Sequence, residues 1–352
     1  MSTRHTSISS VLGEYAGFPV LVLGATGFVG RWVARILTQA GARLYLPARD
    51  CAAAKRTFTE FGIRGELLKL NFLETGITTR MISEINPAIT FNLAGYGIDR
   101  SETSEELAFA INARLPGMVC EAISLTSVPG WSGQRIVHAG TAMEYGSTGG
   151  DLKESSLTSP ASLYGKSKLA GTEAVSSICH QLSLPGVTAR LFGIYGPGES
   201  PARLLPSLIA DSRGSSPIAL TAGLHKRDFT YVEDVAEGLL RLGVASCHPG
   251  EVVNVATGTL TSIRSFVDVA ARELGIGDDR LGFGALPTRP EEMQHDPVNC
   301  ERLVELTGWR PPTGLLSGIR KTINFRQSDN ALTSQAPDSI NYYANCFSRP
   351  WS

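Results

Sequence analysis

The fold of this protein is decided by the stretch VLVLGATGFVGRWVARIL, residues 20–37. It begins with an apolar run of strand length, passes through glycines spaced G-x-x-G-x-x-G, and continues as a helical pattern. Apolar residues at positions 29, 32, 33, 36 and 37 share one face of a helix. The stretch therefore predicts a strand, a tight glycine turn and an amphipathic helix that packs back on the strand.

Each glycine of this turn meets a different need of a phosphate-binding turn. Gly24 permits the sharp turn, Gly27 lets the backbone approach a pyrophosphate, and Gly30 lets the helix pack closely on the strand. The helix N-terminus offers free N–H groups and the positive end of its dipole to the phosphates. A glycine triplet alone is weak evidence, and a flexible turn without a ligand is the alternative. The strand before the triplet and the helix after it favour a dinucleotide site.

The alternation of strand and helix continues along the chain from this turn. Strands are predicted at residues 20–24, 42–48, 65–71, 88–95, 135–141 and 186–192. Continuous apolar strands separated by amphipathic helices are typical of a parallel sheet that helices cover on both faces. The predicted fold class is therefore α/β: a Rossmann-type, doubly wound parallel sheet with a smaller C-terminal α/β substrate-binding domain.

Changes in residue composition and in the pattern of predicted strands and helices divide the chain into four predicted parts. They are an N-terminal extension at 1–18, the dinucleotide-binding domain at 19–190, mainly the substrate-binding domain at 191–326, and a polar tail at 327–352. A Gly- and Pro-rich segment after residue 192 marks the main change, and about 226–262 is expected to pack back on the first domain. The tail is either frayed or a strap held by its late aromatic residues, Tyr342, Tyr343, Phe347 and Trp351.

Composition excludes several classes of function. Of 352 residues, 42% are hydrophobic and 18% charged, which suits a globular fold, and a net charge of -1 leaves no basic field for nucleic acid or anionic lipid. The six cysteines are dispersed without a C-x-x-C pair, and no histidines cluster at the spacing of metal ligands. A disulfide scaffold or a structural zinc site is therefore not expected. The sequence shows no apolar signal segment and no run of bilayer length. We therefore expect a cytoplasmic protein with no metal, nucleic-acid or membrane partner.

The end of the second predicted strand bears on the choice between NAD and NADP. An acidic residue there accepts hydrogen bonds from the ribose hydroxyls of NAD, whereas an arginine pairs with the 2′-phosphate of NADP. Ala48 stands where the carboxylate is usual, and Arg49 follows it. This favours NADP(H). Asp50 keeps NAD(H) open, since a shift of two residues would place a carboxylate at the ribose, and Arg49 would then be a solvated loop cation.

A tyrosine and a lysine open a later predicted helix. Tyr164 and Lys168 are four residues apart and share one helical face. A nearby ammonium lowers the pKa of a phenol, which then exchanges a proton with a substrate oxygen near neutral pH. Thr141, at the end of the strand 135–141, offers a hydroxyl to the same oxygen. A Tyr and a Lys at this spacing are usually exposed surface residues with no catalytic role. The trio of Thr141, Tyr164 and Lys168, which follows a dinucleotide turn, indicates an oxidoreductase site.

From about residue 19 to 325, the chain resembles the extended short-chain dehydrogenases/reductases, a family of nucleotide-sugar epimerases, dehydratases and 4-ketoreductases. The resemblance rests on motifs that recur in this order: GATGFVG (24–30), NLAG (92–95), GTAMEYG (140–146), YGKSK (164–168), LFGIYGPGE (191–199), RDFTYVEDVAEGL (227–239), VVNVATG (252–258) and LTGWRPPTGLLSGI (306–319).

The resemblance implies roles for residues of the trio and around it. Tyr164 is the acid/base, Lys168 its partner and ribose ligand, and Thr141 the hydroxyl that polarises the substrate oxygen. The cofactor residues, with Asn71 and Phe72 beside the adenine, are Gly24, Thr26, Gly27, Phe28, Val29, Gly30, Arg49, Asn71, Phe72, Leu93, Ala94, Gly95, Tyr164, Lys168 and Phe192. The substrate residues are Thr141, Met143, Arg203, Arg227 and Arg289. Guanidinium groups fit the diphosphate of a nucleotide-sugar substrate, although ordinary surface arginines are the alternative.

Departures from the family pattern narrow the reaction. The 4,6-dehydratases carry Asp-Glu directly after the strand-end Thr, but here Ala142 and Met143 stand there, and neither moves a proton. Glu144 comes one residue later, and on an extended segment its side chain would face the other way. We therefore expect Glu144 to be structural and dehydration to be absent. Gly193 replaces an Asn that contacts substrate in many members, so the sugar stays open.

Two reactions on a nucleotide sugar remain. A ketoreductase takes hydride from exchangeable NADPH and reduces a 4-keto-6-deoxy sugar at C4, whereas a 4-epimerase keeps NAD tightly bound. Arg49 favours the reductase, with Tyr164 as its proton donor. A reductase of a non-nucleotide ketone would leave the arginines unpaired, and a non-catalytic NADP sensor would not need the trio. By resemblance, the predicted helices around 105–124 and 164–183 form a homodimer interface.

Overall fold

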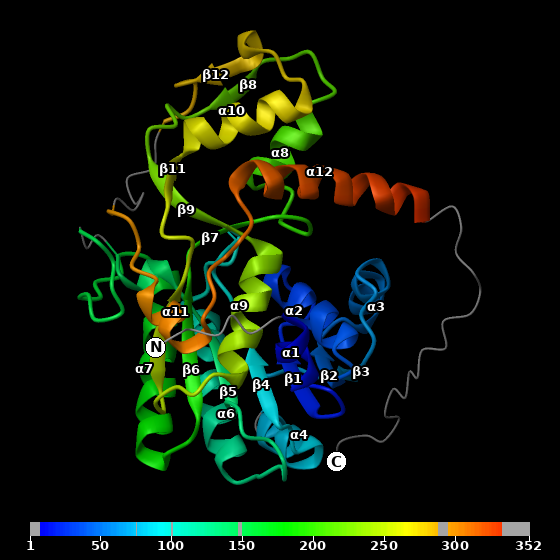
Figure 1. The fold of residues 1–352 in the computed structure, drawn as a ribbon, viewed down its shortest axis with the longest axis vertical. Helices are drawn as coiled ribbons and strands as arrows, with labels where there is room; N and C mark the ends of the chain where they lie inside the picture. Colours follow the sequence, from blue (N-terminus) through cyan, green and yellow to red (C-terminus); the bar gives the residue numbers. More distant parts are fainter. Residues whose placement is uncertain (1–7, 75, 100, 147–149, 288–294, 333–352) are drawn as a thin grey trace.

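A seven-stranded sheet forms the centre of the computed structural model, which describes residues 8–74, 76–99, 101–146, 150–287 and 295–332 (Figure 1). All its strands are parallel, in the order β10-β6-β5-β4-β1-β2-β3. They are β1 (Pro19–Leu23), β2 (Arg43–Ala48), β3 (Glu66–Lys69), β4 (Ile89–Asn92), β5 (Ile136–Thr141), β6 (Gly186–Leu191) and β10 (Glu251–Val255). The strand order reverses between β1 and β4, and in such sheets ligands bind outside the carboxyl ends of the strands at this point.

Helices cover both faces of this sheet. On one face pack α2 (Phe28–Gln39), α3 (Cys51–Glu60) and α9 (Val232–Val244), and on the other α4 (Ile77–Ile85), α6 (Leu115–Ser124) and α7 (Leu163–Leu182). Side chains of β1 alternate between the two cores, with Val20 and Val22 in the first and Leu21 and Leu23 in the second. The doubly wound α/β fold predicted from the sequence is confirmed.

A second group of elements lies at the end of the molecule remote from α4 and α6 (Figure 1). It has its own core, which includes Tyr195, Leu208 and Phe266. One of its two sheets contains the strands β7 (Gly193–Tyr195), β9 (Lys226–Tyr231) and β11 (Leu260–Ser262). The other pairs β8 (Ile218–Leu220) with β12 (Leu281–Phe283). Its helices are α8 (Leu204–Asp211), α10 (Ile263–Leu274) and the start of α12 (Leu315–Leu332).

The segment at 226–262 is shared between these groups, since β9 and β11 join the small sheet while α9 and β10 join the large one. The division into four parts, with its three boundaries, stays a prediction, and the late aromatic residues of the tail lie outside the described residues. The remaining short helices are α1 (Ile8–Gly13), α5 (Glu105–Phe109), the π-helical turn η1 (Ala110–Arg114), the 3-10 turns η2 (Ala142–Glu144) and η3 (Asp278–Arg280), and α11 (Glu301–Thr307).

The helix that carries Tyr164 and Lys168, α7, is seated closely against η1. A Cβ on Gly171 would overlap the carbonyl oxygen of Asn112 in that turn. The buried Asn112 side chain adds to this contact by donating from Nδ2 to the Ser167 hydroxyl at 2.9 Å and to the Tyr96 carbonyl at 2.7 Å. The π-helical turn therefore fixes the position of α7 where the two backbones touch.

We predict that Gly171→Ala destabilises the protein by about 1–3 kcal/mol, because the added methyl group meets backbone that cannot move aside. Gly117→Ala is the matched control: its Cβ would lie 3.5 Å from Cδ1 of Ile178, an ordinary contact. Alanine's higher helix propensity should then leave stability unchanged or raised by up to about 1 kcal/mol. Thermal unfolding midpoints measure both effects. Equal midpoints for the two variants would contradict this account of α7.

Candidate active site

The glycine turn follows β1 at the carboxyl edge of the sheet, and the protein's own packing requires two of its glycines. Gly24 has a φ of +80°, and a Cβ there would lie 2.6 Å from the carbonyl oxygen of Leu93. A Cβ on Gly30 would overlap the carbonyl oxygen of Gly24. At Gly27 the nearest contact of a Cβ is that same oxygen, at 3.1 Å, so packing requires a glycine there less strictly, and its role in admitting a phosphate stays a prediction.

The N-terminus of α2 fits a pyrophosphate. Gly27 is its N-cap residue, and no side chain caps the first N–H groups, which leaves them to a ligand. Arg31, which the sequence analysis passed over, stiffens this turn by donating to the carbonyls of Thr26 at 2.7 Å and Gly27 at 3.1 Å. Its guanidinium lies 5.1 Å from the ring centroid of Phe61, and burial lowers its pKa. The one sequence signal for Arg31 is its place directly after the third glycine.

The residues that would distinguish NAD from NADP lie at the end of β2. Arg49 is exposed and has no hydrogen-bond or ion-pair partner among the described residues. Asp50 is the N-cap of α3, and its carboxylate accepts the N–H groups of Ala52 and Ala53, each at 2.9 Å. These bonds, that of Ala53 first, lower the pKa of Asp50. The carboxylate is thus already engaged in capping a helix.

The other predicted cofactor residues follow neighbouring strands of the sheet. Asn71 and Phe72 come after β3, the segment 93–95 after β4, and Phe192 after β6. Carboxyl ends of parallel strands meet at one edge, so the structure brings this set to the edge that holds the glycine turn. Asn71 already accepts the Leu73 N–H at 3.2 Å. The contacts of these residues with a dinucleotide stay a prediction.

The Thr–Tyr–Lys trio (Thr141, Tyr164 and Lys168) converges at the same edge. Thr141 ends β5, and Tyr164 lies near the start of α7, where the Thr141 hydroxyl acts to lower the pKa of its phenol. Lys168 is buried one turn further along α7 and donates from Nζ to the Ala139 carbonyl at 2.6 Å. Gly97, in the loop after β4, lies against the Tyr164 ring, since its Cβ would be 3.5 Å from Cδ2.

Burial determines the protonation of Tyr164 and Lys168, the two titratable residues of the trio. Desolvation raises the pKa of Tyr164 to about 12; the negative charge of Glu144 adds to this rise, and the hydrogen bond with Thr141 opposes it. Desolvation lowers the pKa of Lys168 to about 8, and Glu144 opposes this fall. The prediction that the Lys168 ammonium lowers the pKa of the phenol is wrong, because desolvation and the charge of Glu144 raise it instead. Tyr164 is therefore a protonated phenol at neutral pH, which suits a proton donor.

The segment after Thr141 forms the 3-10 turn η2 rather than the extended chain on which the sequence argument relied. Met143 donates its N–H to the Thr141 hydroxyl at 3.3 Å. Glu144 is completely buried and pairs with Arg190 at 2.8 Å. Its side chain is directed into the protein, so the structure agrees with a structural Glu144, although a turn and not the alternation of a strand produces that orientation.

The three predicted substrate arginines differ in their placement. Arg203 precedes α8 and donates from Nη2 to the Ile98 carbonyl at 3.3 Å, and its charge acts on the Tyr164 phenol. The structure therefore brings Arg203 to the trio. Arg227 is exposed on β9, beside the buried Asp228, whose carboxylate accepts the N–H groups of residues 257–259. Arg289 lies outside the described residues.

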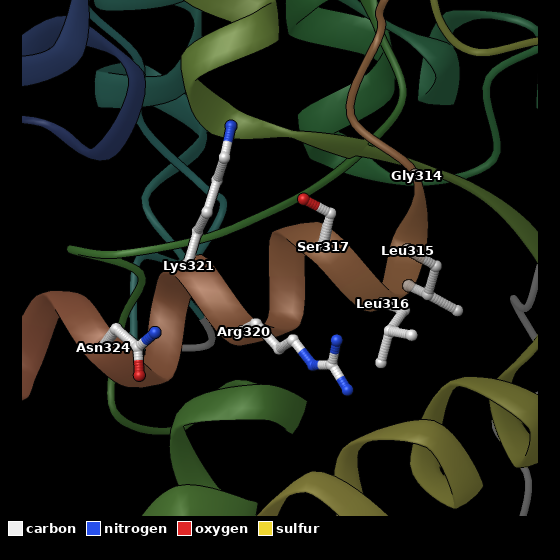
Figure 2. Close-up of a pocket in the computed structure, with 7 residues that line it drawn as sticks. All are labelled: Gly314, Leu315, Leu316, Ser317, Arg320, Lys321 and Asn324. Atoms are coloured by element: carbon white, nitrogen blue, oxygen red, sulfur yellow. The ribbon is translucent and has the colours of Figure 1, made fainter.

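A separate pocket lies along the first turns of α12 (Figure 2) and contains none of the predicted site residues. Arg320 at its edge pairs with Glu273 at 2.7 Å, and Lys321 lies with Nζ 5.2 Å from the ring centroid of Tyr231. The pocket is lined by Gly314, Leu315, Leu316, Ser317, Arg320, Lys321 and Asn324. We assign it no part in the chemistry of the trio.

The described residues form neither a metal site nor a membrane-spanning helix. Among them, no cluster of three or more His, Cys, Asp and Glu side chains could hold a metal ion. Within the same ranges, none of the helices has both the length and the apolar composition needed to cross a membrane.

We predict that affinity for NADPH falls as pH rises through about 8, because the buried Lys168 ammonium loses its proton there. The loss should reach up to about tenfold for each further pH unit, whereas Tyr164, with a pKa of about 12, should not titrate in this range. Fluorescence titrations of NADPH on both sides of pH 8 measure this dependence. Lys168→Met should bind weakly without it. A flat wild-type profile, or an unchanged dependence in Lys168→Met, would contradict the assignment.

Comparisons with known proteins agree with this geometry. Residues 20–256 match the model of the NAD dependent epimerase/dehydratase family. A dTDP-6-deoxy-L-talose 4-dehydrogenase (NAD(P)(+)) from Kitasatospora kifunensis is 29% identical over 86% of this chain and 93% of its own. A UDP-glucose 4-epimerase from Mycolicibacterium smegmatis is 26% identical over 87% and 97%. The UDP-glucuronic acid 4-epimerase from Bacillus cereus, solved with UDP-glucuronic acid and NAD, shares the fold with a TM-score of 0.76 and 20% identity, over 88% of this chain and 99% of that one. The chain belongs to the NAD-dependent epimerase/dehydratase family of extended short-chain dehydrogenases/reductases.

Proposed function

We propose that this protein reduces the C4 carbonyl of a 4-keto-6-deoxy sugar nucleotide with NAD(P)H, and that Tyr164 donates the proton. The observation that carries the proposal is the trio itself. Thr141, Tyr164 and Lys168 meet at the edge of the sheet that holds the glycine turn, and the pKa of Tyr164, at about 12, keeps its phenol protonated. A protonated phenol is the form needed to supply a proton to a carbonyl oxygen that is being reduced.

In this reaction each residue of the trio has a separate task. The dinucleotide, when bound at the glycine turn, supplies the hydride. Tyr164 gives its proton to the oxygen of C4, and Thr141, whose hydroxyl lies close enough to act on the pKa of the phenol, orients and polarises that oxygen. The Lys168 ammonium stabilises the phenolate that Tyr164 becomes, because an opposite charge nearby favours the ionised form.

The surroundings of the trio support reduction over dehydration. Removing water from a sugar needs a second acid/base pair, but Ala142 and Met143 carry no proton-transferring group. Glu144 is buried in its ion pair with Arg190. The Kitasatospora relative is named for dehydrogenation at position 4 of a dTDP-6-deoxy sugar, and the reverse of such a reaction is the proposed reduction. The charge of Arg203 acts on the Tyr164 phenol, which supports a role for this guanidinium in binding a diphosphate beside the trio.

The two residues that directly follow β2 support a preference for NADP(H). The Arg49 guanidinium is exposed, and the Asp50 carboxylate is engaged by the N–H groups of α3. An arginine pairs well with a 2′-phosphate, while NAD recognition needs an accepting carboxylate. NAD(H) remains the second candidate. The homodimer and the cytoplasmic location expected from the sequence also stay predictions.

A nucleotide-sugar 4-epimerase is the alternative, because the mycobacterial relative covers as much of this chain and is named for that reaction. The two reactions differ in their use of the dinucleotide. An epimerase takes hydride from the sugar and returns it, so it retains NAD, whereas a reductase exchanges its dinucleotide at each turnover.

Denaturing freshly purified protein and identifying any released dinucleotide by mass separates the two. We expect little bound dinucleotide, tighter binding of NADPH than of NADH, and NADPH consumption with a 4-keto-6-deoxy sugar nucleotide. Tyr164→Phe should bind NADPH nearly as well as the wild type and lose turnover by about 10²–10⁴-fold. Stoichiometric NAD without NADPH consumption would contradict the reductase, and full turnover in Tyr164→Phe would contradict the proton donor.

We predict that Arg49→Ala weakens NADPH binding by about tenfold or more and leaves NADH binding nearly unchanged, since only NADPH carries the 2′-phosphate. Arg43→Ala is the matched control: Arg43 is an exposed arginine at the other end of β2 and donates to the Gly17 carbonyl. Its loss should affect neither dinucleotide. Equal losses for NADPH and NADH in Arg49→Ala would show that Arg49 does not contact the 2′-phosphate.

A further inference from the structure

Glu144 is a completely buried carboxylate that contacts three separate elements. It accepts the backbone N–H of Thr141 at 2.8 Å, where β5 ends. It accepts the hydroxyl of Thr172 on α7 at 3.0 Å and pairs with Arg190 Nε on β6 at 2.8 Å. Such an engaged carboxylate holds β5, β6 and α7 together where the trio lies.

The contact with Thr172 acts on the face of α7 that carries Tyr164 and Lys168. Residues 164, 168 and 172 are spaced by four, so they form one stripe along α7. The contact with the Thr141 N–H fixes the other side, because Thr141 is the strand-end residue whose hydroxyl acts on the pKa of Tyr164. Glu144 therefore joins the strand end that presents Thr141 to the helix face that presents Tyr164 and Lys168.

The position of Glu144 is itself well determined. Its partner Arg190 is 4% exposed, stacks 4.5 Å from the ring centroid of Tyr145, and donates to the Glu154 carbonyl at 3.2 Å. The hydroxyl of Tyr145 in turn donates to Asn254 on β10 at 2.7 Å. Three neighbouring strands thus support the ion pair, which leaves Glu144 little freedom to move.

The charge of Glu144 also reaches the trio. Around Lys168 lie Tyr164 on the same helix, His138 on β5 and Glu144 on η2. Burial and the Lys168 charge lower the pKa of His138, which is therefore neutral. Glu144, with Arg190 behind it, acts as the negative group, and its charge raises the pKa of Lys168 against the fall that burial causes.

We propose that Glu144 is a positioning residue for the reaction: it holds Thr141 against the Tyr164–Lys168 face of α7 and supplies the negative charge that the buried Lys168 ammonium faces. This deepens the proposed function and rests on it for the role of the trio. The contacts that carry it are the Thr141 N–H, the Thr172 hydroxyl and the Arg190 guanidinium.

The charge is tested by Glu144→Gln, read out as the pH dependence of NADPH binding, which requires no sugar substrate. Loss of the negative charge should shift the fall in affinity to lower pH by about one unit. Glu154→Gln is the matched control, because Glu154 accepts the Asn254 N–H at 2.9 Å in the same network, one step further from the trio. It should leave the pH dependence unchanged. No shift in Glu144→Gln, or no pH dependence in the wild type, would overturn the electrostatic role.

Glu144→Gln leaves Arg190 without its charged partner and can prevent folding, so Glu144→Gln/Arg190→Gln, which is neutral overall, serves as the second variant. Its pH dependence should also shift to lower pH, and an unshifted profile in a folded double variant would overturn the role as well. If NADPH binding shifts as expected while the wild type reduces no 4-keto-6-deoxy sugar nucleotide, the proposed function fails and the charge effect of Glu144 stands.

The positioning is tested by Thr172→Val, which removes one contact of Glu144 and keeps its charge. We expect kcat to fall several-fold with little change in KM and in the pH dependence of NADPH binding. Thr172→Ser, which keeps the hydroxyl, should restore kcat. Wild-type kcat in Thr172→Val would overturn the positioning role, as would equal losses in the Val and Ser variants.

Discussion

The contact between the glycine turn and the backbone after β4 is the constraint on which the rest of this structure depends. Gly24, at a φ of +80°, lies where any side chain would strike the Leu93 carbonyl, and Gly30 lies directly against Gly24. These contacts bring the N-terminus of α2 to the point where the strand order of the sheet reverses. The uncapped N–H groups, the ends of β3 and β4 and the trio on β5 and α7 then share one edge, and chemistry between a dinucleotide and a second ligand becomes feasible there.

A second constraint is electrostatic. At this edge the protein buries an ammonium, Lys168, and an ion pair, Glu144–Arg190. Burying a charge is costly unless it is paired and hydrogen-bonded, which accounts for the bonds that surround both carboxylate oxygens of Glu144. The result is a site in which the phenol of Tyr164 stays protonated while the lysine stays charged near neutral pH. This combination suits donation of a proton to the oxygen of a carbonyl group that is being reduced.

Much of this arrangement could be predicted from the sequence because it is local. The six predicted strands of the first domain are all present, since apolar runs between amphipathic helices mark them, and the i, i+4 spacing alone places Tyr164 and Lys168 together. Contacts between residues that lie far apart in the sequence could not be predicted. Arg190 lies 46 residues and Thr172 lies 28 residues from Glu144, and no local pattern connects them. The 3-10 turn η2, the π-helical turn η1 and the burial that raises the pKa of Tyr164 depend on tertiary packing. The extended chain predicted in place of η2 and the lowered pKa predicted for Tyr164 were therefore wrong, and η1 was not predicted.

Hydride transfer into the product tests the central claim most directly. The protein is incubated with a 4-keto-6-deoxy sugar nucleotide and NADPH that carries deuterium at both positions of the nicotinamide C4, and the product is analysed by mass and by NMR. The account predicts one deuterium per product molecule, bound at C4 of the sugar, with one NADPH consumed for each product. A product that forms without deuterium, or a nucleotide sugar that is interconverted while added NADPH is untouched, would contradict the reductase and identify an enzyme that recycles its own hydride.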